Sequence, residues 1–306
     1  MVQKNSIKNK IIIICGPTAS GKSAVALECA KLLDSEIIYA DSMDIYKNLN
    51  IGTAKPTLSE QSIVKHHLID VANPNEDFSV SQYKQLALPI INDLINKGKV
   101  PIICGGTGFY INSILYDFSY GNGKGDLNVR EKYKKIAEEF GNNYVYNLLK
   151  EIDPLSAEKI HENDVKRVIR ALEIAETGIK KSDIQDDLTP KYNYSAYSIN
   201  FDRELLYKRI NDRVDQMFKL GLVDEVNSLI NSGITIKNQC MQGIGYKEVY
   251  SYINNEISLD ECIELIKLNT RHYAKRQITF FKKLNGLQYL EPDSPKILAQ
   301  RIINLL

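Results

Sequence analysis

The sequence predicts an α/β protein: a P-loop-containing parallel sheet flanked by helices, with an all-helical insertion domain. Three features support this fold class. Short apolar runs alternate with helical patterns in the first third, a glycine-rich phosphate-loop motif follows the first run, and a long helical stretch comes after a polar break. Of the 306 residues, 43% are hydrophobic and 25% charged, which provides a folded core and excludes intrinsic disorder.

The first third of the chain reads as three strands separated by two helices. The apolar runs Lys10 to Cys15, Glu36 to Ala40 and Val100 to Cys104 have strand length. Ser23 to Leu33 and Ser81 to Asn96 repeat apolar residues at helical spacing. Strands that alternate with helices are joined by crossovers, so we expect a parallel sheet covered by helices.

A polar stretch from Gly121 to Gly125 breaks this alternation. The pattern from Val129 to Gly178 is helical, and a charged linker with Pro190 follows. The helical part contains an apolar stripe of Val165, Val168, Ile169 and Leu172. We therefore predict three segments: residues 1–120 form the first part of the α/β core, 121–190 the helical insertion domain, and 191–306 the second part of the core.

Beyond the insertion, the α/β core is expected to resume. Tyr194 to Phe201 alternates polar and apolar residues as a strand does. It leads into a helix from Glu204 to Leu220, which Gly221 ends. A capping box at Ser258 begins a last long helix, whose pattern runs to Asn285.

Charge and cysteine usage limit the partners and the compartment. Lys plus Arg (39) nearly equals Asp plus Glu (38), so a polyanion would have to be held by local basic clusters. The five cysteines are scattered singly, without a zinc or disulfide pattern, which is typical of a reducing compartment. The apolar run Ile11 to Cys15 is far too short to span a membrane. We expect a cytoplasmic protein with no membrane partner.

The strongest motif matches GxxxxGK[ST] in full. It lies between a strand and a helix, which is where a phosphate-binding loop of this kind is found. Its residues are Gly16, Pro17, Thr18, Ala19, Ser20, Gly21, Lys22 and Ser23. The glycines let backbone N–H groups converge on a phosphate, while Lys22 supplies a cation and Ser23 a hydroxyl for Mg²⁺. The loop predicts a bound phosphate compound without saying which one.

Two further strand ends carry polar groups. Asp41 follows the strand after the loop's helix, where it is a candidate general base, or it caps a turn with Ser42. The strand from Val100 ends in Gly105 to Gly108, which includes Thr107. This segment is either a ligand-binding loop at the carboxyl edge of the sheet or a plain turn.

Several basic residues could hold phosphates. Arg209 and Arg213 share a helical face and could neutralise a diphosphate, or they are solvated or ion-paired. His66 and His67 argue poorly for a metal site, because neighbours in an extended segment point to opposite sides.

The last long helix carries a basic stripe, flanked by His272, Arg276 and Lys283 and interleaved with Phe280 and Phe281. The stripe consists of Lys267, Arg271, Lys275 and Lys282. It is either a polyanion face suited to unstacked bases or a solvated cationic helix end. A second cluster of Lys166, Arg167 and Arg170 lies opposite the apolar stripe of the insertion. Two clusters favour an extended ligand.

With these residues in hand, the chain resembles the tRNA dimethylallyltransferases, also called tRNA isopentenyltransferases, over nearly its whole length. Besides the phosphate loop, the resemblance rests on an ordered set of motifs. They are Ala40-Asp-Ser42 with Tyr46, Ile51-Gly-Thr-Ala-Lys-Pro56, His66-His-Leu-Ile-Asp70, Gly105-Gly-Thr-Gly108, Arg167-Val-Ile-Arg-Ala-Leu-Glu173, Gly243-Ile-Gly-Tyr-Lys247, Thr270-Arg271 and Ala274-Lys-Arg-Gln-Ile-Thr279.

The resemblance implies transfer of a dimethylallyl group from dimethylallyl diphosphate to N6 of the adenosine 3′ of the anticodon, in tRNAs reading codons that begin with U. The loop from Gly16 to Ser23 would hold the diphosphate, with Mg²⁺ on Ser23. Thr107 and an arginine, for which we favour Arg209, would help to neutralise the leaving group. Asp41 matches the general base, and the adenosine must be flipped to reach it.

Family similarity also implies the tRNA contacts, which fall in both predicted domains. They are Asp41, Ser42, Met43, Asp44, Thr107, Arg130, Lys166, Arg167, Val168, Ile169, Arg170, Gln242, Gly243, Ile244, Gly245, Tyr246, Lys247, Lys275, Arg276, Gln277, Ile278, Thr279, Phe280, Phe281 and Lys282. Three positions depart from the family: Asp44, Glu162 and Phe280 stand where Gln, Pro and Trp are usual. The zinc finger of eukaryotic relatives is absent, which indicates a bacterial-type enzyme. We also expect a monomer.

Three alternatives belong to other classes. A P-loop kinase of a small metabolite would need ATP and leaves the basic helix unexplained. An isopentenyltransferase of free adenine nucleotides has no use for an extended RNA surface. A non-enzymatic RNA-binding protein leaves Asp41 and the intact loop without a role.

Overall fold

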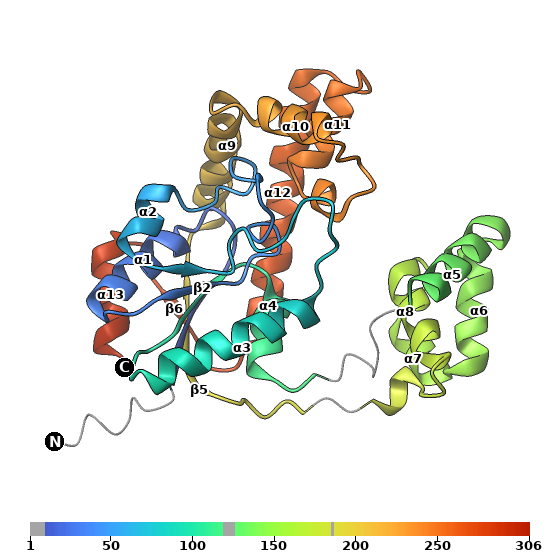
Figure 1. Ribbon diagram of the computed structural model, residues 1–306, viewed down its shortest axis with the longest axis horizontal. Coiled ribbons are helices and arrows are strands. Elements are labelled where there is room, and N and C mark those ends of the chain that lie inside the picture. The colour runs from blue at the N-terminus through green and yellow to red at the C-terminus, as the bar shows by residue number, and fades with distance from the viewer. Residues whose placement is uncertain (1–9, 119–125, 185–186) are drawn as a thin grey trace. The chain divides into compact units, whose positions relative to one another are not determined.

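The computed structural model describes residues 10–118, 126–184 and 187–306 (Figure 1). The chain divides into two compact units, one of Met1–Leu115 with Pro190–Leu306 and the other of Tyr116–Thr189. The predicted boundary at 120/121 and its glycines lie outside the described residues.

The first unit is built on a six-stranded sheet whose neighbouring strands all pair in parallel, which confirms the predicted fold class. The order across the sheet is β3-β2-β4-β1-β5-β6. The strands are β1 (Lys10–Cys15), β2 (Ile37–Tyr39), β3 (His66–His67), β4 (Ile102–Gly105), β5 (Asn193–Ile199) and β6 (Leu287–Leu290). The strand predicted after the insertion is β5, which pairs with β1 and so returns the chain to the core.

The central strand is buried on both faces. Ile11, Ile12, Ile13 and Ile14 are all at most 1% exposed, which explains why this strand is a continuous apolar run and does not alternate. On one face, Ile12 and Ile14 join a core with α1 (Lys22–Leu32) and α13 (Pro295–Asn304), which lie side by side in Figure 1.

Parallel pairing brings the ends of the central strands into register. Cys15 of β1 pairs with Gly105 of β4, and Tyr39 of β2 pairs with Cys104 of β4. The phosphate loop, the segment from Ala40 and the segment after Gly105 therefore begin at the same carboxyl edge. This edge is where open parallel sheets bind ligands.

Most predicted helices of the first unit are present within a few residues, and further ones appear. The helices are α1 (Lys22–Leu32), α2 (Leu58–Ile63), α3 (Val80–Asn96), α4 (Gly108–Leu115), α9 (Arg203–Lys219), α10 (Leu222–Asn231), η2 (Gln239–Gln242), α11 (Tyr246–Ile253), α12 (Leu259–Phe281) and α13 (Pro295–Asn304). Gly221, with φ 95°, separates α9 from α10. The pattern predicted α12 to reach Asn285, but it ends at Phe281, because Lys283 and Leu284 turn back onto the carbonyls of Phe280 and Phe281.

The second unit is helical, with α5 (Leu127–Phe140), α6 (Asn142–Ile152), α7 (Pro154–Lys159), α8 (Val165–Ala175) and η1 (Lys181–Asp183). The predicted apolar stripe is confirmed, since Val168, Ile169 and Leu172 of α8 are buried in a core with Val145 and Leu149 of α6.

The sheet edge requires glycine at position 105. A Cβ atom there would lie 2.1 Å from the backbone oxygen of Ala40, which cannot move without shifting β2. We expect Gly105→Ala to lower the free energy of unfolding by about 3 kcal/mol, as measured by urea denaturation.

Gly98→Ala is the control. Gly98 has φ +73° but meets nothing within 4 Å, so the substitution carries only the backbone cost of about 1 kcal/mol. Equal losses in the two variants would contradict the steric argument.

Candidate active site

The phosphate loop adopts a backbone that depends on left-handed residues. Gly16 (φ 133°), Ala19 (φ 62°) and Gly21 (φ 84°) all have positive φ. A Cβ atom on Gly16 would lie 2.5 Å from the hydroxyl of Ser198 on β5, so glycine allows the loop to approach the sheet closely. The side chain of Ser20 is buried, and its hydroxyl has no protein partner.

Two cations border this loop. The ammonium of Lys22 lies 3.4 Å from the carbonyl oxygen of Pro17. The Nε of Arg209, on α9, donates to the carbonyl of Ala19 at 2.8 Å, and its guanidinium lies over the ring of Phe201. These contacts hold Arg209 beside the phosphate loop, which leads into α1.

Asp41 and Thr107 come together from β2 and β4. The carboxylate of Asp41 accepts from the backbone N–H of Met43 at 3.0 Å, so it does cap a turn. The hydroxyl of Thr107 accepts from the N–H of Ser42 at 2.9 Å and lies 3.3 Å from the Ser42 hydroxyl. The turn leaves the second oxygen of Asp41 available for proton transfer.

A cavity of about 440 Å³ in the first unit is lined by Thr18 of the phosphate loop and by the segment from Asp41 to Met43. Its lining draws on the loop, the segment after β2, α9, the segment before α11, and α12. The predicted site residues among its lining are Thr18, Asp41, Ser42, Met43, Gln242, Gly243, Ile244, Lys247 and Arg276. Residues far apart in the sequence thus surround one volume large enough for a nucleobase.

Arg213 lines this cavity, and the carboxyl of Asp44 is buried within reach of the charges of Asp41 and Arg213. Asp44 is 5% exposed, and one of its carboxylate oxygens has no hydrogen-bond partner among the residues that the structure describes. Burial, followed by the charge of Asp41, raises the pKa of Asp44 to about 7, although Lys55 and Arg213 oppose the shift. Arg213 donates to the carbonyl of Thr53 at 2.9 Å, and its buried Nε is unpartnered.

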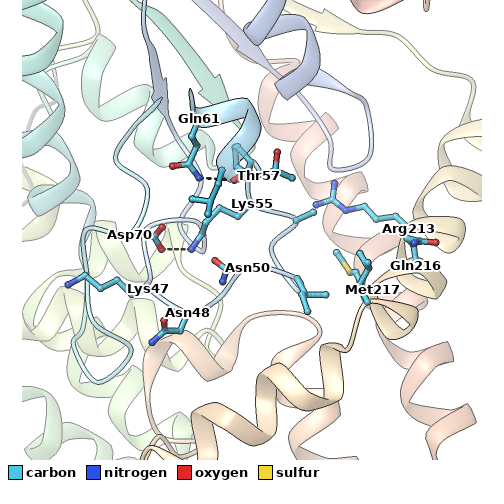
Figure 2. A pocket seen from close by; sticks show the side chains of 15 residues that line it. Lys47, Asn48, Asn50, Lys55, Thr57, Gln61, Asp70, Arg213, Gln216 and Met217 are labelled. Atoms are coloured by element: carbon cyan, nitrogen blue, oxygen red, sulfur yellow. Dashed lines mark hydrogen bonds and ion pairs between the residues drawn. The ribbon is translucent and has the colours of Figure 1, made fainter. Parts of the chain in front are cut away.

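A second cavity, of about 900 Å³, lies between the segment from Lys47 to Leu58 and α9 (Figure 2). It shares Arg213 and Met217 with the first cavity. Lys55 holds the segment from Lys47 to Leu58 in place, because its buried ammonium donates to Asp70 at 2.7 Å and to the carbonyl of Tyr46 at 2.6 Å.

The loop between the two cavities is held by Glu225 of α10. Its carboxylate accepts from the backbone N–H groups of Asn50, Ile51 and Gly52 at 2.8, 2.8 and 3.1 Å. The hydroxyl of Tyr246 donates to the same carboxylate at 2.7 Å. Tyr246 was predicted to contact tRNA, but it is 1% exposed and supports this loop.

The predicted basic stripe on α12 divides into engaged and exposed residues. Lys267 is 14% exposed and pairs with Asp215 at 2.8 Å and Glu264 at 3.1 Å, and Arg271 donates to Asn211 at 2.8 Å. At these two positions the stripe is engaged by side chains of the protein itself, whichever interpretation of the stripe holds. The exposed residues of this helix end are Lys275, Arg276, Thr279, Lys282 and Lys283.

Other predicted contacts on α12 face the protein. Phe281 and Gln277 are 2% and 4% exposed. Ile278 packs with Ala19 and Ile210 in a small core. Phe280 lies against Gly108, where a Cβ would come within 2.1 Å of its ring, and edge-on to the exposed ring of Phe109.

The second unit presents its cations around a buried carboxylate. Both oxygens of Glu173, 3% exposed, accept from Arg130 Nε at 3.1 and 3.0 Å, and Arg170 donates to it at 2.7 Å. Lys166 and Arg167 are exposed, whereas Val168 and Ile169 face the helical core.

Sequence analysis did not name Tyr273, and it gave Gln277 and Asp44 only as tRNA contacts. Tyr273 lines the first cavity, and burial together with the charge of Asp41 raises its pKa, so the phenol stays protonated. For Gln277 a signal was present, because it falls at helical spacing between Ala274 and Phe281 on the buried face of α12. Nothing in the sequence indicated that Asp44 and Glu173 would be buried.

The described residues contain no group of three or more His, Cys, Asp or Glu side chains arranged to hold a metal ion. His67 bonds to Glu36 at 2.6 Å, and His66 to the carbonyl of Val64 at 2.6 Å. All five cysteines are buried and free. Among the helices in the described ranges, none has the length and apolar character needed to cross a membrane.

Comparison with known proteins gives consistent results. The profile of the IPP transferase family matches residues 44–284. A tRNA dimethylallyltransferase from Acetivibrio thermocellus is 47% identical over 289 residues, covering 93% of this chain and 92% of the relative. One from Caldanaerobacter subterraneus is 47% identical over 293 residues, with 94% and 93% covered.

Solved structures agree. The full-length tRNA isopentenylpyrophosphate transferase from Bacillus halodurans has a TM-score of 0.73 at 38% identity, covering 97% of this chain and 95% of that chain. A eukaryotic dimethylallyltransferase described as acting on tRNA has a TM-score of 0.78 at 31% identity, with 92% and 74% covered.

The raised pKa of Asp44 predicts a pH-dependent stability. The unfolded carboxyl ionises near its ordinary pKa, whereas the folded one stays protonated until about pH 7, so this group's stabilisation is lost as the pH rises between the two values. Asp44→Asn mimics the neutral form. Relative to the natural protein, it should gain up to roughly 4 kcal/mol in free energy of unfolding between pH 4 and pH 7, and no more above.

Urea denaturation at several pH values measures this difference. Asp34→Asn is the control for the same change at the surface, since the Asp34 side chain is 99% exposed and its ion pair with Lys99, at 3.7 Å, is a surface pair. Its effect on the free energy of unfolding should stay below about 1 kcal/mol. If the difference in free energy of unfolding between Asp44→Asn and the natural protein did not change with pH, the raised pKa of Asp44 would be contradicted.

Proposed function

The chain belongs to the IPP transferase family. On this premise we propose that it transfers a dimethylallyl group from dimethylallyl diphosphate to N6 of the adenosine 3′-adjacent to the anticodon. The tRNAs that it modifies are those reading codons that begin with U. The products are N6-dimethylallyladenosine and diphosphate. One observation carries the proposal: a single cavity joins the phosphate loop at Thr18 to Asp41 and to Arg276 of the basic helix. A residue of the phosphate-binding loop, the candidate base and an exposed cation of α12 thus line one volume.

The loop from Gly16 to Ser23 is assigned to the diphosphate. Support comes from its left-handed backbone, from Lys22, and from the unpartnered buried hydroxyl of Ser20. Arg209 and Thr107 are assigned to neutralising the leaving group. Arg209 is favoured by its hydrogen bond to Ala19, and the half-buried Arg213 offers a second cation beside the cavity.

Asp41 is assigned as the general base. As N6 attacks the allylic carbon, the bond from that carbon to the diphosphate oxygen breaks, and its electron pair leaves with the diphosphate. The proton of N6 then passes to the free oxygen of Asp41, whose other oxygen accepts from Met43. Flipping the adenosine out of the anticodon stack brings N6 into the cavity.

The donor set fits Mg²⁺. This ion keeps several waters and is held by one or two protein oxygens together with substrate phosphates, so it does not require a cluster of carboxylates. Ser23, at the start of α1, would supply that oxygen beside Lys22. When bound, Mg²⁺ would offset the negative charge of the diphosphate.

The tRNA is assigned to cations of both units. In the first unit these are Lys275 and Arg276 on α12 and Lys282 directly after it, all exposed. In the helical unit, residues 116–189, they are Arg130 and the cluster from Lys166 to Arg170. An anticodon stem-loop is long enough to use two such surfaces, which a free nucleotide is not. The protein is assigned to the cytoplasm and to a monomeric state.

The decisive experiment offers both kinds of acceptor. The purified protein is incubated with Mg²⁺, dimethylallyl diphosphate and unmodified tRNA, beside a tube that holds AMP, and the digested nucleosides are weighed by mass spectrometry. A dimethylallyl adduct on tRNA adenosine alone supports the proposal. An adduct on AMP would identify a nucleotide-specific enzyme, and no adduct with ATP consumed in its place would identify a kinase.

Asp41→Asn should separate chemistry from binding. The amide oxygen of Asn can still accept from Met43, so the turn survives, but it takes no proton. We expect kcat to fall by about 10² to 10⁴, with tRNA and diphosphate affinities retained. Single-turnover assays and calorimetry measure these quantities, and a natural kcat would rule out Asp41 as the base.

Lys275→Ala should weaken tRNA binding and reduce the slope of log K against log salt by about one, because one phosphate contact is lost. Lys267→Ala is the matched control from the same helix. Lys267 pairs with Asp215 and Glu264, so its removal should leave the slope unchanged. Filter-binding titrations at several salt concentrations provide both slopes, and an unchanged slope for Lys275→Ala would exclude that contact.

A further inference from the structure

Gln277 bridges the two glycine-rich loops of the site. Its side-chain oxygen accepts from the backbone N–H of Thr18 at 2.9 Å, and its side-chain nitrogen donates to the carbonyl of Gly106 at 3.0 Å. The residue is 4% exposed, so both bonds are shielded from water. A buried amide with both ends paired is held in one orientation.

The chemistry of the two partners requires an amide at this position. Thr18 presents a donor and Gly106 an acceptor, so the bridging side chain must accept at one end and donate at the other. A carboxylate would set a second oxygen against the Gly106 carbonyl, and a thioether of the same length would make neither bond. Gly106 has to lack a side chain, since a Cβ there would lie 2.2 Å from the Gln277 nitrogen.

The bridge also shapes the phosphate loop. The N–H of Thr18 is taken up by Gln277 and therefore does not point at a phosphate. Thr18 begins the turn in which Ala19 and Gly21 have positive φ, and a fixed Thr18 limits the alternatives open to that turn. Loops that bind anions through backbone N–H groups depend on such preorganisation.

Gln277 lies on the helix that also faces the acceptor. Tyr273 and Arg276 line the cavity one turn or less away, and Lys275 is exposed next to them. Helix α12 therefore touches the phosphate loop through Gln277 and the acceptor side through its neighbours. A rigid helix between two sites allows occupancy of one to affect the other.

We propose that Gln277 is a positioning residue, which holds the phosphate loop and the Gly105 to Gly108 loop against α12 in the geometry that binds the diphosphate. This role replaces the tRNA contact that the sequence resemblance implies for Gln277. The inference rests on the proposed function, because it takes the ligand of the loop to be a diphosphate.

Two variants of Gln277 separate the bonds from the packing. Gln277→Met keeps the length and volume of the side chain but removes both bonds. Gln277→Glu keeps the acceptor for Thr18 and repels Gly106. Each should weaken binding of inorganic diphosphate with Mg²⁺ about tenfold, and raise the KM for dimethylallyl diphosphate alike, while tRNA affinity stays within about twofold.

Two matched variants complete the design. Gly106→Ala attacks the same bridge from the other loop and should reproduce the loss of diphosphate affinity even if a Gln277 variant folds poorly. Lys275→Met, from the exposed side of the same turn, should give the opposite signature: weaker tRNA binding and unchanged diphosphate binding.

Calorimetry with inorganic diphosphate, tRNA titration and thermal melting are performed on the full chain. Loss of diphosphate affinity in Gln277→Met and Gly106→Ala, with tRNA affinity kept, supports the proposal. Natural diphosphate affinity together with weakened tRNA binding would overturn it and restore the tRNA contact. If the natural protein itself binds no diphosphate, the proposed function falls, and the inference with it.

Discussion

The parallel register of β1, β2 and β4 is the constraint on which the rest of the site depends. Because Cys15 pairs with Gly105 and Tyr39 with Cys104, three loops start side by side at one edge of the sheet, with the loop after β4 between the other two. The fit is tight enough that β4 must end in glycine beneath the Ala40 carbonyl. A one-residue shift of β2 against β4 would move Asp41 relative to Thr107 by about 3.3 Å, and the same shift of β1 against β4 would move the phosphate loop relative to both.

Buried and half-buried polar side chains then hold segments of the chain together. Glu225 gathers three backbone N–H groups of the loop between the cavities, Gln277 joins the two glycine-rich loops, and Glu173 fixes two arginines of the helical unit. Each is almost fully paired, as burial of a polar group requires. Asp44 departs from this pattern, because one of its oxygens has no hydrogen-bond partner in the described part of the chain. Burial, followed by the charge of Asp41, raises the pKa of this carboxyl.

The exposure of the lysines and arginines around α12 depends on whether other side chains pair with them. Lys267 and Arg271 occupy the part of α12 that packs against α9, where Asp215 and Asn211 engage them. Toward the helix end, Lys275, Arg276 and Lys282 have no such neighbours within the described residues and remain exposed. The exposed lysines and arginines of this helix are therefore found toward its C-terminal end.

The sequence by itself determined the parallel α/β class, the phosphate loop, and the apolar face of the insertion helix at Val168 and Leu172. These features follow from local periodicity and from a contiguous motif. The residues that determine each of them are close together in the sequence. Short pieces such as β6 and α13 escaped prediction, because they are stable only through packing on β5 and α1. Only the tertiary structure decided that Gln277 binds two loops, that Asp44 is buried beside Asp41, and which lysines stay exposed. The reason is physical: burial and pairing of a polar side chain depend on neighbours that are distant in sequence, and residue type and spacing do not specify those neighbours.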